Sequence, residues 1–365
     1  MKNVTIIGLG LIGGSWARAL KRVRADMQIC AVDICPDTLQ LAMEMKCIDQ
    51  GTTNLVEGVK NADLVVVATL TAEITSVCEK IKNNLQPGCI ITDVGSTKKE
   101  ISDELYQILP AHTEYIPGHP MAGSESKGLK GADPYLFENA VYILTPRSLI
   151  KTPNVSILEE LIKAMGGRVL FLTPEEHDIK VAAISHLPHL LASTLVYGVS
   201  HMEEAYGEIF KLAAGGFRDL TRIADSQPEM WCDIFRQNRQ GVLQALAYFH
   251  EAIRQIEKAV EDKDAADILN FLQKAKDERA KVPVKIKGIL PNLYEAVVIV
   301  PDQPGIIGRL ANLLGKENIN IIDIEILRVR EGDGGTIRLG FSSEVLRDRA
   351  IELLRKKGYA VQAKG

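Results

Sequence analysis

The fold is decided by Val4-Thr5-Ile6-Ile7-Gly8-Leu9-Gly10-Leu11-Ile12-Gly13-Gly14-Ser15. The first four residues form an uncharged, β-branched run typical of a buried strand, and a helix-compatible segment follows to about Lys21. Between them lies G-x-G-x-x-G, in which Gly8 serves the tight turn, Gly10 lets the main chain approach a pyrophosphate, and Gly13 allows close packing of helix on strand. The start of the helix offers free N–H groups and a positive dipole end to phosphates.

A second apolar run, Gln28 to Val32, ends in Asp33. A carboxylate roughly twenty residues past the glycines can accept both ribose hydroxyls of an adenosine. No Arg or Lys follows within several residues to receive a 2′-phosphate, so NAD is favoured over NADP. The alternative, a glycine-rich turn in another α/β domain, would leave Asp33 unexplained. We expect the cofactor to be bound by Gly8, Gly10, Leu11, Ile12, Gly13, Asp33, Thr69 and Ser96.

Length and composition describe a soluble protein of more than one domain. The 365 residues suit two or three domains, and 46% hydrophobic with 25% charged residues is ordinary for globular proteins. The net charge of −4 provides no basic field for nucleic acid. The short basic run Arg355-Lys356-Lys357 reads as a solvated helix end. Binding of nucleic acid is therefore not expected.

The cysteines and the amino terminus indicate a cytoplasmic protein. The six cysteines form no C-x-x-C pair and lie mostly in apolar patterns, so we expect reduced core residues. The amino terminus enters its strand at once, which leaves no room for a signal peptide. The segment from Val181 to Val199 carries no formal charge, but its histidines, hydroxyl residues and Pro188 favour a buried helix over a membrane span.

Alternating strand and helix patterns continue to about residue 173. They predict a mostly parallel, doubly wound sheet, the Rossmann-like domain 1–173, in which ligands bind at the carboxyl ends of strands. Ser96 and the loop after Ile116 therefore become site candidates. The expected strands are 64–68, 89–94, 114–116, 140–144 and 168–172, and the expected helices are 73–85, 98–109 and 156–165, with Ser96 or Thr97 capping the second helix.

Helical patterns replace strands in a second domain, 174–282. Its segment from Asp178 to Val199 is apolar on nearly all sides, which a helix accepts only when protein surrounds it. Another subunit is the natural cover, so we expect a homodimer. Pro188 should kink this helix. A linker, 283–293, then leads to a βαββαβ pattern in 294–365, which predicts a small ferredoxin-like domain.

Three motifs carry candidate chemistry. His119, in Gly118-His119-Pro120-Met121-Ala122-Gly123, follows a strand of the cofactor domain and suits removal of a hydroxyl proton, although a loop-ordering histidine is an equal alternative. His186 and His189 lie three apart in the apolar helix. No Cys or carboxylate stands beside them to complete a metal site, so a core histidine or one pointing into a substrate cavity is expected, and no metal.

The third motif, Gly215-Gly216-Phe217-Arg218-Asp219-Leu220-Thr221-Arg222, carries two arginines. A guanidinium binds a carboxylate through two parallel hydrogen bonds, so Arg222 or Arg218 is a candidate clamp for an acidic substrate. An arginine paired with Asp219 or Asp225 on a helix surface is at least as compatible with the spacing.

Together these motifs resemble prephenate dehydrogenase of tyrosine biosynthesis with a carboxyl-terminal ACT domain. The resemblance rests on Val94-Gly95-Ser96 before a lysine pair, Gly-His-Pro-Met-Ala-Gly, Ser-His-Leu-Pro-His, Gly-Gly-Phe-Arg-Asp-Leu-Thr-Arg-Ile-Ala and Glu229-Met230-Trp231, and it covers nearly the whole chain. It implies hydride transfer from the ring hydroxyl carbon of prephenate to NAD⁺ with decarboxylation, giving 4-hydroxyphenylpyruvate and CO₂. The active site is then expected in the crevice between the first two domains.

The resemblance also implies roles for individual residues. His119 would hydrogen-bond and deprotonate the hydroxyl, and Ser96 would help to orient His119, substrate and nicotinamide. Arg222 matches the carboxylate-binding arginine, and His189 the residue near the pyruvyl side chain. The remaining substrate-site residues implied by the match are Gly215, Glu125 and Asp219, the last two near the pocket entrance.

In the last domain, Val300-Pro301-Asp302-Gln303-Pro304-Gly305-Ile306 and Asn318-Ile319-Asn320-Ile321 look like the first loop and second strand of the ACT family. That family implies binding of a small amino acid, with L-tyrosine as the expected effector. The expected effector residues are Asp302, Gly305, Ile306, Asn320 and Ile321. An ACT fold can also persist as a purely structural pairing module.

Two other functions remain open. One is an arogenate (cyclohexadienyl) dehydrogenase, which shares the chemistry but has an amino group in place of the keto group on the substrate side chain. The other is a non-catalytic regulator that binds NAD and an amino acid. Retention of His119 and Arg222 argues against the regulator, because a pure sensor needs no proton acceptor.

Overall fold

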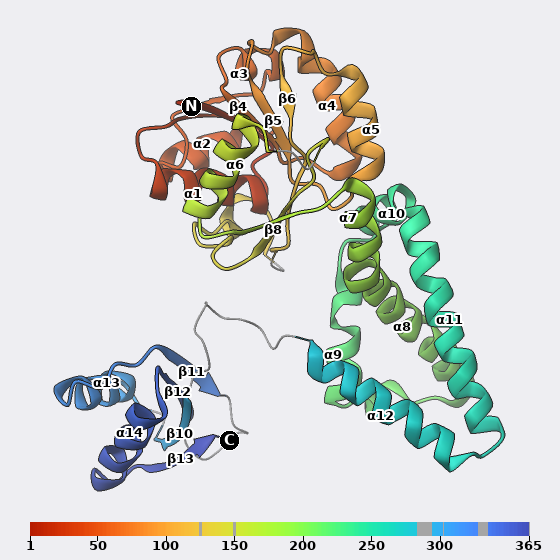
Figure 1. The fold of residues 1–365 in the computed structure, drawn as a ribbon, viewed down its shortest axis with the longest axis vertical. Coiled ribbons are helices and arrows are strands. Elements are labelled where there is room, and N and C mark those ends of the chain that lie inside the picture. The colour runs from red at the N-terminus through yellow and green to blue at the C-terminus, as the bar shows by residue number, and fades with distance from the viewer. Residues whose placement is uncertain (124–125, 149–150, 283–293, 302, 328–334, 365) are drawn as a thin grey trace. The chain divides into compact units, whose positions relative to one another are not determined.

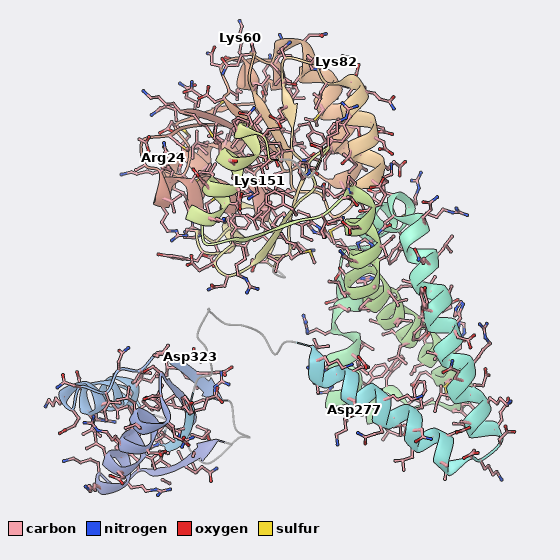
Figure 2. The ribbon with its side chains drawn as sticks, viewed as in Figure 1. Arg24, Lys60, Lys82, Lys151, Asp277 and Asp323 are labelled. Atoms are coloured by element: carbon pink, nitrogen blue, oxygen red, sulfur yellow. The ribbon has the colours of Figure 1, made fainter. Side chains whose placement is uncertain are left out.

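The structure is a computed structural model that describes residues 1–123, 126–148, 151–282, 294–301, 303–327 and 335–364. It divides into two compact units, Met1–Lys281 and Val282–Gly365, each described here by itself (Figure 1). The boundary expected between 173 and 174 falls inside the first unit and stays a prediction. Charged side chains such as Arg24, Lys60 and Asp277 point outward from the surface (Figure 2).

A six-stranded parallel sheet forms the centre of the first unit. Its spatial order is β3-β2-β1-β4-β5-β6, so the direction of winding reverses between β1 and β4. The expected doubly wound sheet is confirmed, and the crevice at the carboxyl ends of β1 and β4 is where such sheets bind ligands. The strands are β1 (Asn3–Ile7), β2 (Gln28–Val32), β3 (Gln50–Thr52), β4 (Leu64–Val67), β5 (Ile90–Asp93) and β6 (Glu114–Tyr115).

Helices cover both faces of this sheet because successive strand residues point to opposite sides. Val4 and Ile6 pack in one buried cluster with Trp16, whereas Ile7 packs in the other with Ile74. The helices are α1 (Leu11–Val23), α2 (Pro36–Glu44), α3 (Leu55–Val59), α4 (Ile74–Ile81), α5 (Lys99–Ile108) and α6 (Pro153–Ala164), with 3₁₀ turns η1 (Thr71–Glu73), η2 (Lys82–Asn84) and η3 (Leu129–Gly131).

A second, three-stranded sheet corrects one expectation. The strands expected at 140–144 and 168–172 do not join the parallel sheet but form a separate one, of β7 (Gly118–Pro120), β8 (Val141–Leu144) and β9 (Arg168–Phe171). β7 runs antiparallel to β8, and β8 parallel to β9. β7 escaped the sequence pattern because Gly-His-Pro has neither β-branched residues nor an apolar alternation.

A bundle of helices completes the first unit (Figure 1). It begins at a capping box, in which the Thr173 hydroxyl accepts from the Glu176 N–H and the Glu176 carboxylate accepts from the Thr173 N–H. A π-helical turn precedes Pro188, where the sequence predicted a kink. The elements are α7 (Pro174–Val181), the π turn η4 (Ala182–His186), α8 (Leu187–Tyr206), η5 (Phe210–Leu212), α9 (Gly215–Thr221), η6 (Arg222–Asp225), α10 (Pro228–Gln237), α11 (Arg239–Glu261) and α12 (Ala265–Lys281).

The continuous helix Pro174–Tyr206 is long and apolar enough to cross a membrane by length and composition alone, and 28% of its most apolar window is buried. A soluble core helix can meet the same criteria. Large apolar side chains on it are exposed within one chain, among them Ile184, Tyr197 and Tyr206. A single chain therefore leaves part of this helix exposed. A second copy of the chain could cover the exposed part in the predicted homodimer.

The second unit is a four-stranded antiparallel sheet of order β11-β12-β10-β13 with two helices, which confirms the ferredoxin-like prediction. Its core comprises residues such as Val298, Leu310, Leu339 and Leu354. Residues 318–321, which resemble the second strand of the ACT family, lie just before the observed strand β11. The elements are β10 (Tyr294–Val300), α13 (Ile306–Lys316), β11 (Asp323–Leu327), β12 (Gly335–Phe341), α14 (Glu344–Lys356) and β13 (Ala360–Lys364).

All six cysteines are free thiols, but they are not all core residues. Cys47, Cys78 and Cys89 are buried as expected, and burial raises the pKa of Cys78 and Cys89 to about 12. Cys35 and Cys232 are exposed, so the expectation of core residues is wrong for these two. Cys35 lies at the N-cap of α2, where the chain leaves the sheet.

Candidate active site

The glycine loop has the geometry that a dinucleotide requires. Gly8 adopts φ +91°, and a Cβ there would lie 2.7 Å from the Ala68 carbonyl oxygen. A Cβ on Gly13 would lie 1.9 Å from the Gly8 carbonyl oxygen, so only glycine lets α1 approach β1 this closely. A Cβ on Gly10 would meet nothing within 4 Å in the described part of the chain, which leaves space beside the start of α1 for a phosphate.

Asp33 stands beside this loop at the end of β2. Its two carboxylate oxygens accept the Leu9 N–H at 2.7 Å and the Cys35 N–H at 2.9 Å, which fix the carboxylate and leave lone pairs for ribose hydroxyls. Leu11 and Ile12 form the first turn of α1, and Thr69 and Ser96 follow β4 and β5. The residues present therefore fit a dinucleotide across the switch point of the sheet.

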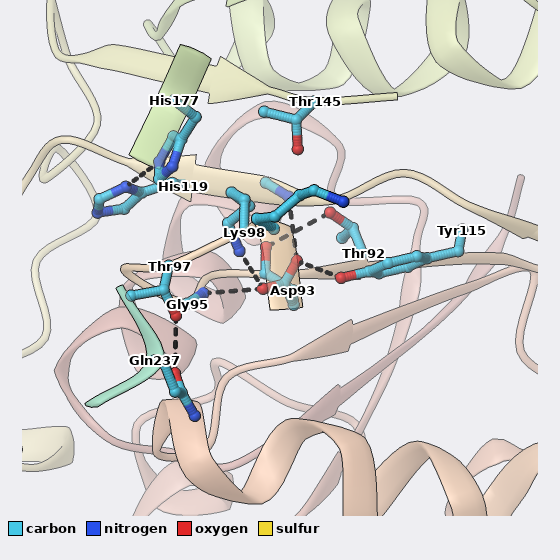
Figure 3. Close-up of polar contacts among 12 residues, drawn as sticks. Thr92, Asp93, Gly95, Thr97, Lys98, Tyr115, His119, Thr145, His177 and Gln237 are labelled. Carbon is cyan, nitrogen blue, oxygen red and sulfur yellow. Dashed lines mark hydrogen bonds and ion pairs between the residues drawn. The ribbon is translucent and has the colours of Figure 1, made fainter. Parts of the chain in front are cut away.

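His119 lies on β7, and 8% of its surface is exposed. Its Nδ1 is 2.8 Å from Nε2 of His177 (Figure 3). Nδ1 of His177 is in turn 2.7 Å from Oδ1 of Asp178. Between His119 and Ser96, both described, there is no hydrogen bond. The side chain that orients His119 in this structure is thus His177, on α7, and the role of Ser96 stays a prediction.

Asp178, His177 and His119 form a hydrogen-bonded relay, and its pattern assigns the tautomers of the two histidines. The Asp178 carboxylate also accepts the main-chain N–H groups of Lys98 at 2.8 Å and Lys99 at 2.9 Å, so it acts as an acceptor toward three donors. His177 therefore donates from Nδ1, and its Nε2 accepts the Nδ1 hydrogen of His119. Nε2 of His119 is left with a lone pair, which makes it a general-base candidate.

The same carboxylate corrects the expected start of α5. Neither Ser96 nor Thr97 caps this helix; its N-cap is Lys98, with no side-chain cap of its own. Asp178 comes from α7 and serves the free N–H groups instead, which places a negative charge at the positive end of the helix. The Asp178 carboxylate thus both orients His177 and satisfies the N–H groups at the start of α5.

A buried ion pair lies beneath the relay. Lys98 and Asp93 are both fully buried, and the Lys98 ammonium contacts the Asp93 carboxylate (Figure 3). The other Asp93 oxygen accepts the Tyr115 hydroxyl and the Gly118 N–H, each at 3.1 Å. These hydrogen bonds satisfy the buried carboxylate and tie β5 to the residue that precedes His119.

Burial and neighbouring charge keep the histidines neutral. Burial is the main cause that lowers the pKa of His119 well below its usual value, and His177, Lys98 and His186 act in the same direction. Burial also lowers the pKa of His177, opposed in part by its hydrogen bond to Asp178. At neutral pH, His119 is therefore ready to accept a proton.

These shifts predict a pH-dependent stability. Burial lowers the pKa of His186 to about 4, alongside His119 and His177. Because each folded pKa lies below the unfolded value of about 6.5, the unfolded state binds more protons as pH falls. The stabilisation is complete above pH 6.5 and is lost in acid, so the melting temperature of the first unit should fall from pH 7.5 to 5.5.

Circular dichroism melts across this range check the prediction. His186→Gln should reduce the slope, because it removes one of these three buried histidines. A melting temperature that stayed constant or rose on acidification would contradict the assignment of neutral buried histidines.

The helical bundle holds a cavity of about 550 Å³. Its wall includes His189 and Trp231, whose rings stack with centroids 3.7 Å apart and planes 15° apart. His189 is 5% exposed, and neither ring nitrogen makes a well-formed hydrogen bond to a described residue. Burial lowers its pKa, and the nearby main chain of Ile223 acts in the opposite direction. His189, which was predicted to point into a substrate cavity, lines this cavity, and its role toward a substrate stays a prediction.

The cavity is joined to the residues around His119 through the end of α10. The Thr97 hydroxyl donates to Oε1 of Gln237 at 2.7 Å (Figure 3). The next residue, Asn238, donates to the Asp178 carbonyl oxygen at 2.7 Å and lies 3.2 Å from Nδ1 of His186. The loop that carries Ser96 therefore contacts the helix that forms one wall of the cavity.

The other predicted substrate residues lie apart from this wall. Arg222 begins η6, and Gly215 and Asp219 lie on α9, all three exposed in one chain. None of them lines the cavity, although Ala224 of η6 does. Glu125 lies outside the described residues.

In the second unit, Gly305 caps α13 with φ +82°, and Ile306 is buried in the first turn. Asn320 is exposed and Ile321 half-buried just before β11. Asp302 lies outside the described residues. The positive φ of Gly305 explains why a glycine is found at this position. The effector roles of these residues stay predictions.

Sequence reasoning missed His177, Asp178, Asp93 and Lys98. The signal for the first pair is a His-Asp dipeptide that follows a helix-start motif and precedes an otherwise apolar helix. Asp93 was expected only as part of the strand 89–94, and Lys98 only as the start of the helix 98–109 and a member of the lysine pair after Ser96. Only the folded chain shows that all four are buried.

Known proteins resemble this chain along its length. Residues 16–171 match the family described as prephenate dehydrogenase, nucleotide-binding domain; residues 173–274 match its dimerization domain; residues 294–354 match the ACT domain. Prephenate dehydrogenase of Bacillus subtilis strain 168 is 38% identical over 97% of this chain and 96% of its own.

Two crystal structures show the same fold in the first unit. That of Aquifex aeolicus prephenate dehydrogenase with hydroxyphenyl propionate and NAD⁺ superposes with a TM-score of 0.73 and 31% identity, over 78% of this chain and 99% of that one. Synechocystis arogenate dehydrogenase superposes with 0.68 and 29% identity, over 77% and 100%. NAD is the cofactor that these findings and the glycine loop support. The chain belongs to the prephenate dehydrogenase family.

Proposed function

We propose that the chain converts prephenate and NAD⁺ to 4-hydroxyphenylpyruvate, CO₂ and NADH. The observation that carries the proposal is the relay from Asp178 through His177 to His119, which ends in an unprotonated Nε2. The glycine loop and Asp33 belong to the same unit and fit the cofactor. The names of the relatives from Bacillus and Aquifex support the choice of substrate.

In this mechanism Nε2 of His119 accepts the proton of the ring hydroxyl. NAD⁺, which the glycine loop and Asp33 would hold, would supply the hydride acceptor for the carbon that bears this hydroxyl, and that carbon would become a carbonyl. The ring carboxylate then leaves as CO₂, and its bonding electrons make the ring aromatic. The resulting phenolate recovers the proton from His119, which returns to its neutral form.

The surroundings of His119 support this role. Its depressed pKa keeps the base free at neutral pH, and the hydrogen bond to His177 fixes which nitrogen carries the lone pair. When His119 takes the proton, Asp178 lies two hydrogen bonds away and stabilises the positive charge through His177. Ser96, Arg222, His189, Gly215, Glu125 and Asp219 remain our proposed orienting and substrate-binding residues.

An activity assay tests the proposal directly. NADH formation at 340 nm with NAD⁺ and prephenate should be measurable, with kcat/KM constant at neutral pH and falling in acid as His119 is protonated. Arogenate in place of prephenate is the matched substrate control. Turnover of arogenate alone would make arogenate the substrate, as the name of the Synechocystis relative says of that protein. Turnover of neither compound would contradict the proposed function.

Regulation and assembly are part of the proposal. We infer a cytoplasmic homodimer, supported by the dimerization-domain match and by the exposed apolar face of Pro174–Tyr206. The ACT match supports feedback inhibition by L-tyrosine through the second unit. A chain ending at Lys281, where the first compact unit ends, should keep activity and lose tyrosine sensitivity. Unchanged inhibition of that shorter chain would refute the regulatory role.

A further inference from the structure

Two arginines on the cavity wall have no assigned role. Arg236, near the end of α10, and Arg239, at the start of α11, both line the cavity that contains His189 and Trp231. Neither forms an ion pair or hydrogen bond with another side chain among the residues that the structure describes. By contrast, Arg254 further along α11 pairs with Glu251 at 2.7 Å. The cavity thus presents two guanidinium groups whose donors are available to a ligand.

The rest of the cavity suits a six-membered ring. The stacked rings of His189 and Trp231 and the side chain of Phe235 provide flat apolar walls, and about 550 Å³ is within the range of small-molecule sites. His189 is a buried polar side chain whose ring nitrogens await a partner. A ring that carries a hydrogen-bonding group and a carboxylate would satisfy all of these groups.

The two arginines are sequence neighbours of residues that contact the loop of Ser96 and the relay. They flank Gln237 and Asn238 in the sequence, and these two residues contact Thr97 and Asp178. The main-chain segment that carries Arg236 and Arg239 is therefore the same segment that contacts the loop of Ser96. Arg222, the arginine expected from the sequence, does not line this cavity.

We propose that Arg236 and Arg239 form a carboxylate-binding subsite that anchors a carboxylate of the substrate while its ring lies against Trp231. The identity of the natural ligand rests on the proposed function, whereas the subsite itself rests on the cavity. A dianionic substrate needs a second cationic anchor besides Arg222, and paired guanidinium groups match a carboxylate in charge and geometry.

Trp231 provides a direct readout of binding. The chain has two tryptophans, and Trp16 is fully buried in the core of the nucleotide-binding sheet, away from the cavity lining. We would titrate the full-length protein with 4-hydroxyphenylpropionate, which carries one carboxylate, and with 4-ethylphenol, which has a similar ring and none. The double variant Arg236→Gln with Arg239→Gln should bind 4-hydroxyphenylpropionate about 10- to 100-fold more weakly and 4-ethylphenol unchanged.

Matched variants separate this subsite from a general effect. Arg254→Gln removes an exposed arginine from the same helix and should leave both titrations unchanged, and the double Arg→Lys variant should recover part of the carboxylate affinity. In turnover, the double Gln variant should raise KM for prephenate and leave KM for NAD⁺ unchanged. Unchanged 4-hydroxyphenylpropionate binding, or equal weakening of both ligands, would overturn the subsite.

The same experiment keeps the two proposals distinguishable. A wild-type protein that binds 4-hydroxyphenylpropionate through these arginines but turns over neither prephenate nor arogenate would support the subsite and refute the enzyme. A wild-type protein that turns over prephenate with a KM indifferent to both arginines would support the enzyme and refute the subsite.

Discussion

Replacement of His119 by Asn is expected to lower kcat by about 10²- to 10⁴-fold and to leave the Kd for NAD⁺ nearly unchanged. Asn is similar in size to part of the imidazole and can keep a hydrogen bond to His177, but it cannot accept the hydroxyl proton. The cofactor contacts assigned to the glycine loop and Asp33 are not altered. The loss should therefore appear in kcat, measured by NADH formation, and not in NAD⁺ binding measured by titration.

His112→Asn is the matched control for this variant. His112 is exposed, and its chain position just before β6 places it at the amino end of that strand, opposite the edge where the site lies. It should retain wild-type kcat. An His119→Asn enzyme with wild-type activity would remove His119 from the mechanism and return it to the loop-ordering interpretation.

Replacement of Asp178 by Asn should also lower kcat by about 10²- to 10⁴-fold, although Asp178 is not proposed to touch the substrate. An amide has one acceptor atom and one donor group, whereas Asp178 accepts hydrogen bonds on both oxygens. If the NH₂ faces His177, that ring must accept at Nδ1 and donate from Nε2. His119 then accepts at Nδ1 and carries its hydrogen on Nε2, where the base is needed.

If the NH₂ instead faces Lys99, the start of α5 loses an acceptor and meets a second donor. Either orientation is harmful, because Oδ1 accepts the Lys98 N–H as well as the His177 Nδ1 hydrogen, so an NH₂ at either position also removes an acceptor from the start of α5. A lower melting temperature is therefore expected in both cases. Asp103→Asn is the control: it lies on α5, is exposed, and contacts Lys99. It should keep wild-type kcat. Wild-type kcat in Asp178→Asn would show that the relay does not set the tautomer of His119.

Local patterns in the sequence predicted most of the architecture. The turn after β1 requires glycines because of its own backbone geometry. Period-two patterns in strands and helical patterns in helices indicated which faces of these elements are buried. These patterns also predicted the βαββαβ order of the second unit, because its strands and helices are amphipathic. His119 and His189 were identified by their positions beside expected strands and in an apolar helix.

The relay was not predictable in this way. His119 and His177 are 58 residues apart in the sequence, and their contact depends on how α7 packs beside β7. Sequence patterns also cannot show that a helix start is satisfied by a carboxylate from elsewhere in the chain. Nothing in the sequence pattern singled out Arg236 and Arg239, and only the folded chain shows that they line one cavity with His189 and Trp231.

The carboxylate at the start of α5 also limits how this gene can be divided. A fragment that stopped at residue 173 would leave the Lys98 and Lys99 N–H groups without their acceptor and His119 without His177. The domain boundary predicted between residues 173 and 174 therefore separates Asp178 and His177 from the groups to which they hydrogen-bond. Chimeras that exchange the nucleotide-binding region between relatives need their junction beyond His186, so that α7 and its acidic residue travel with the sheet they complete.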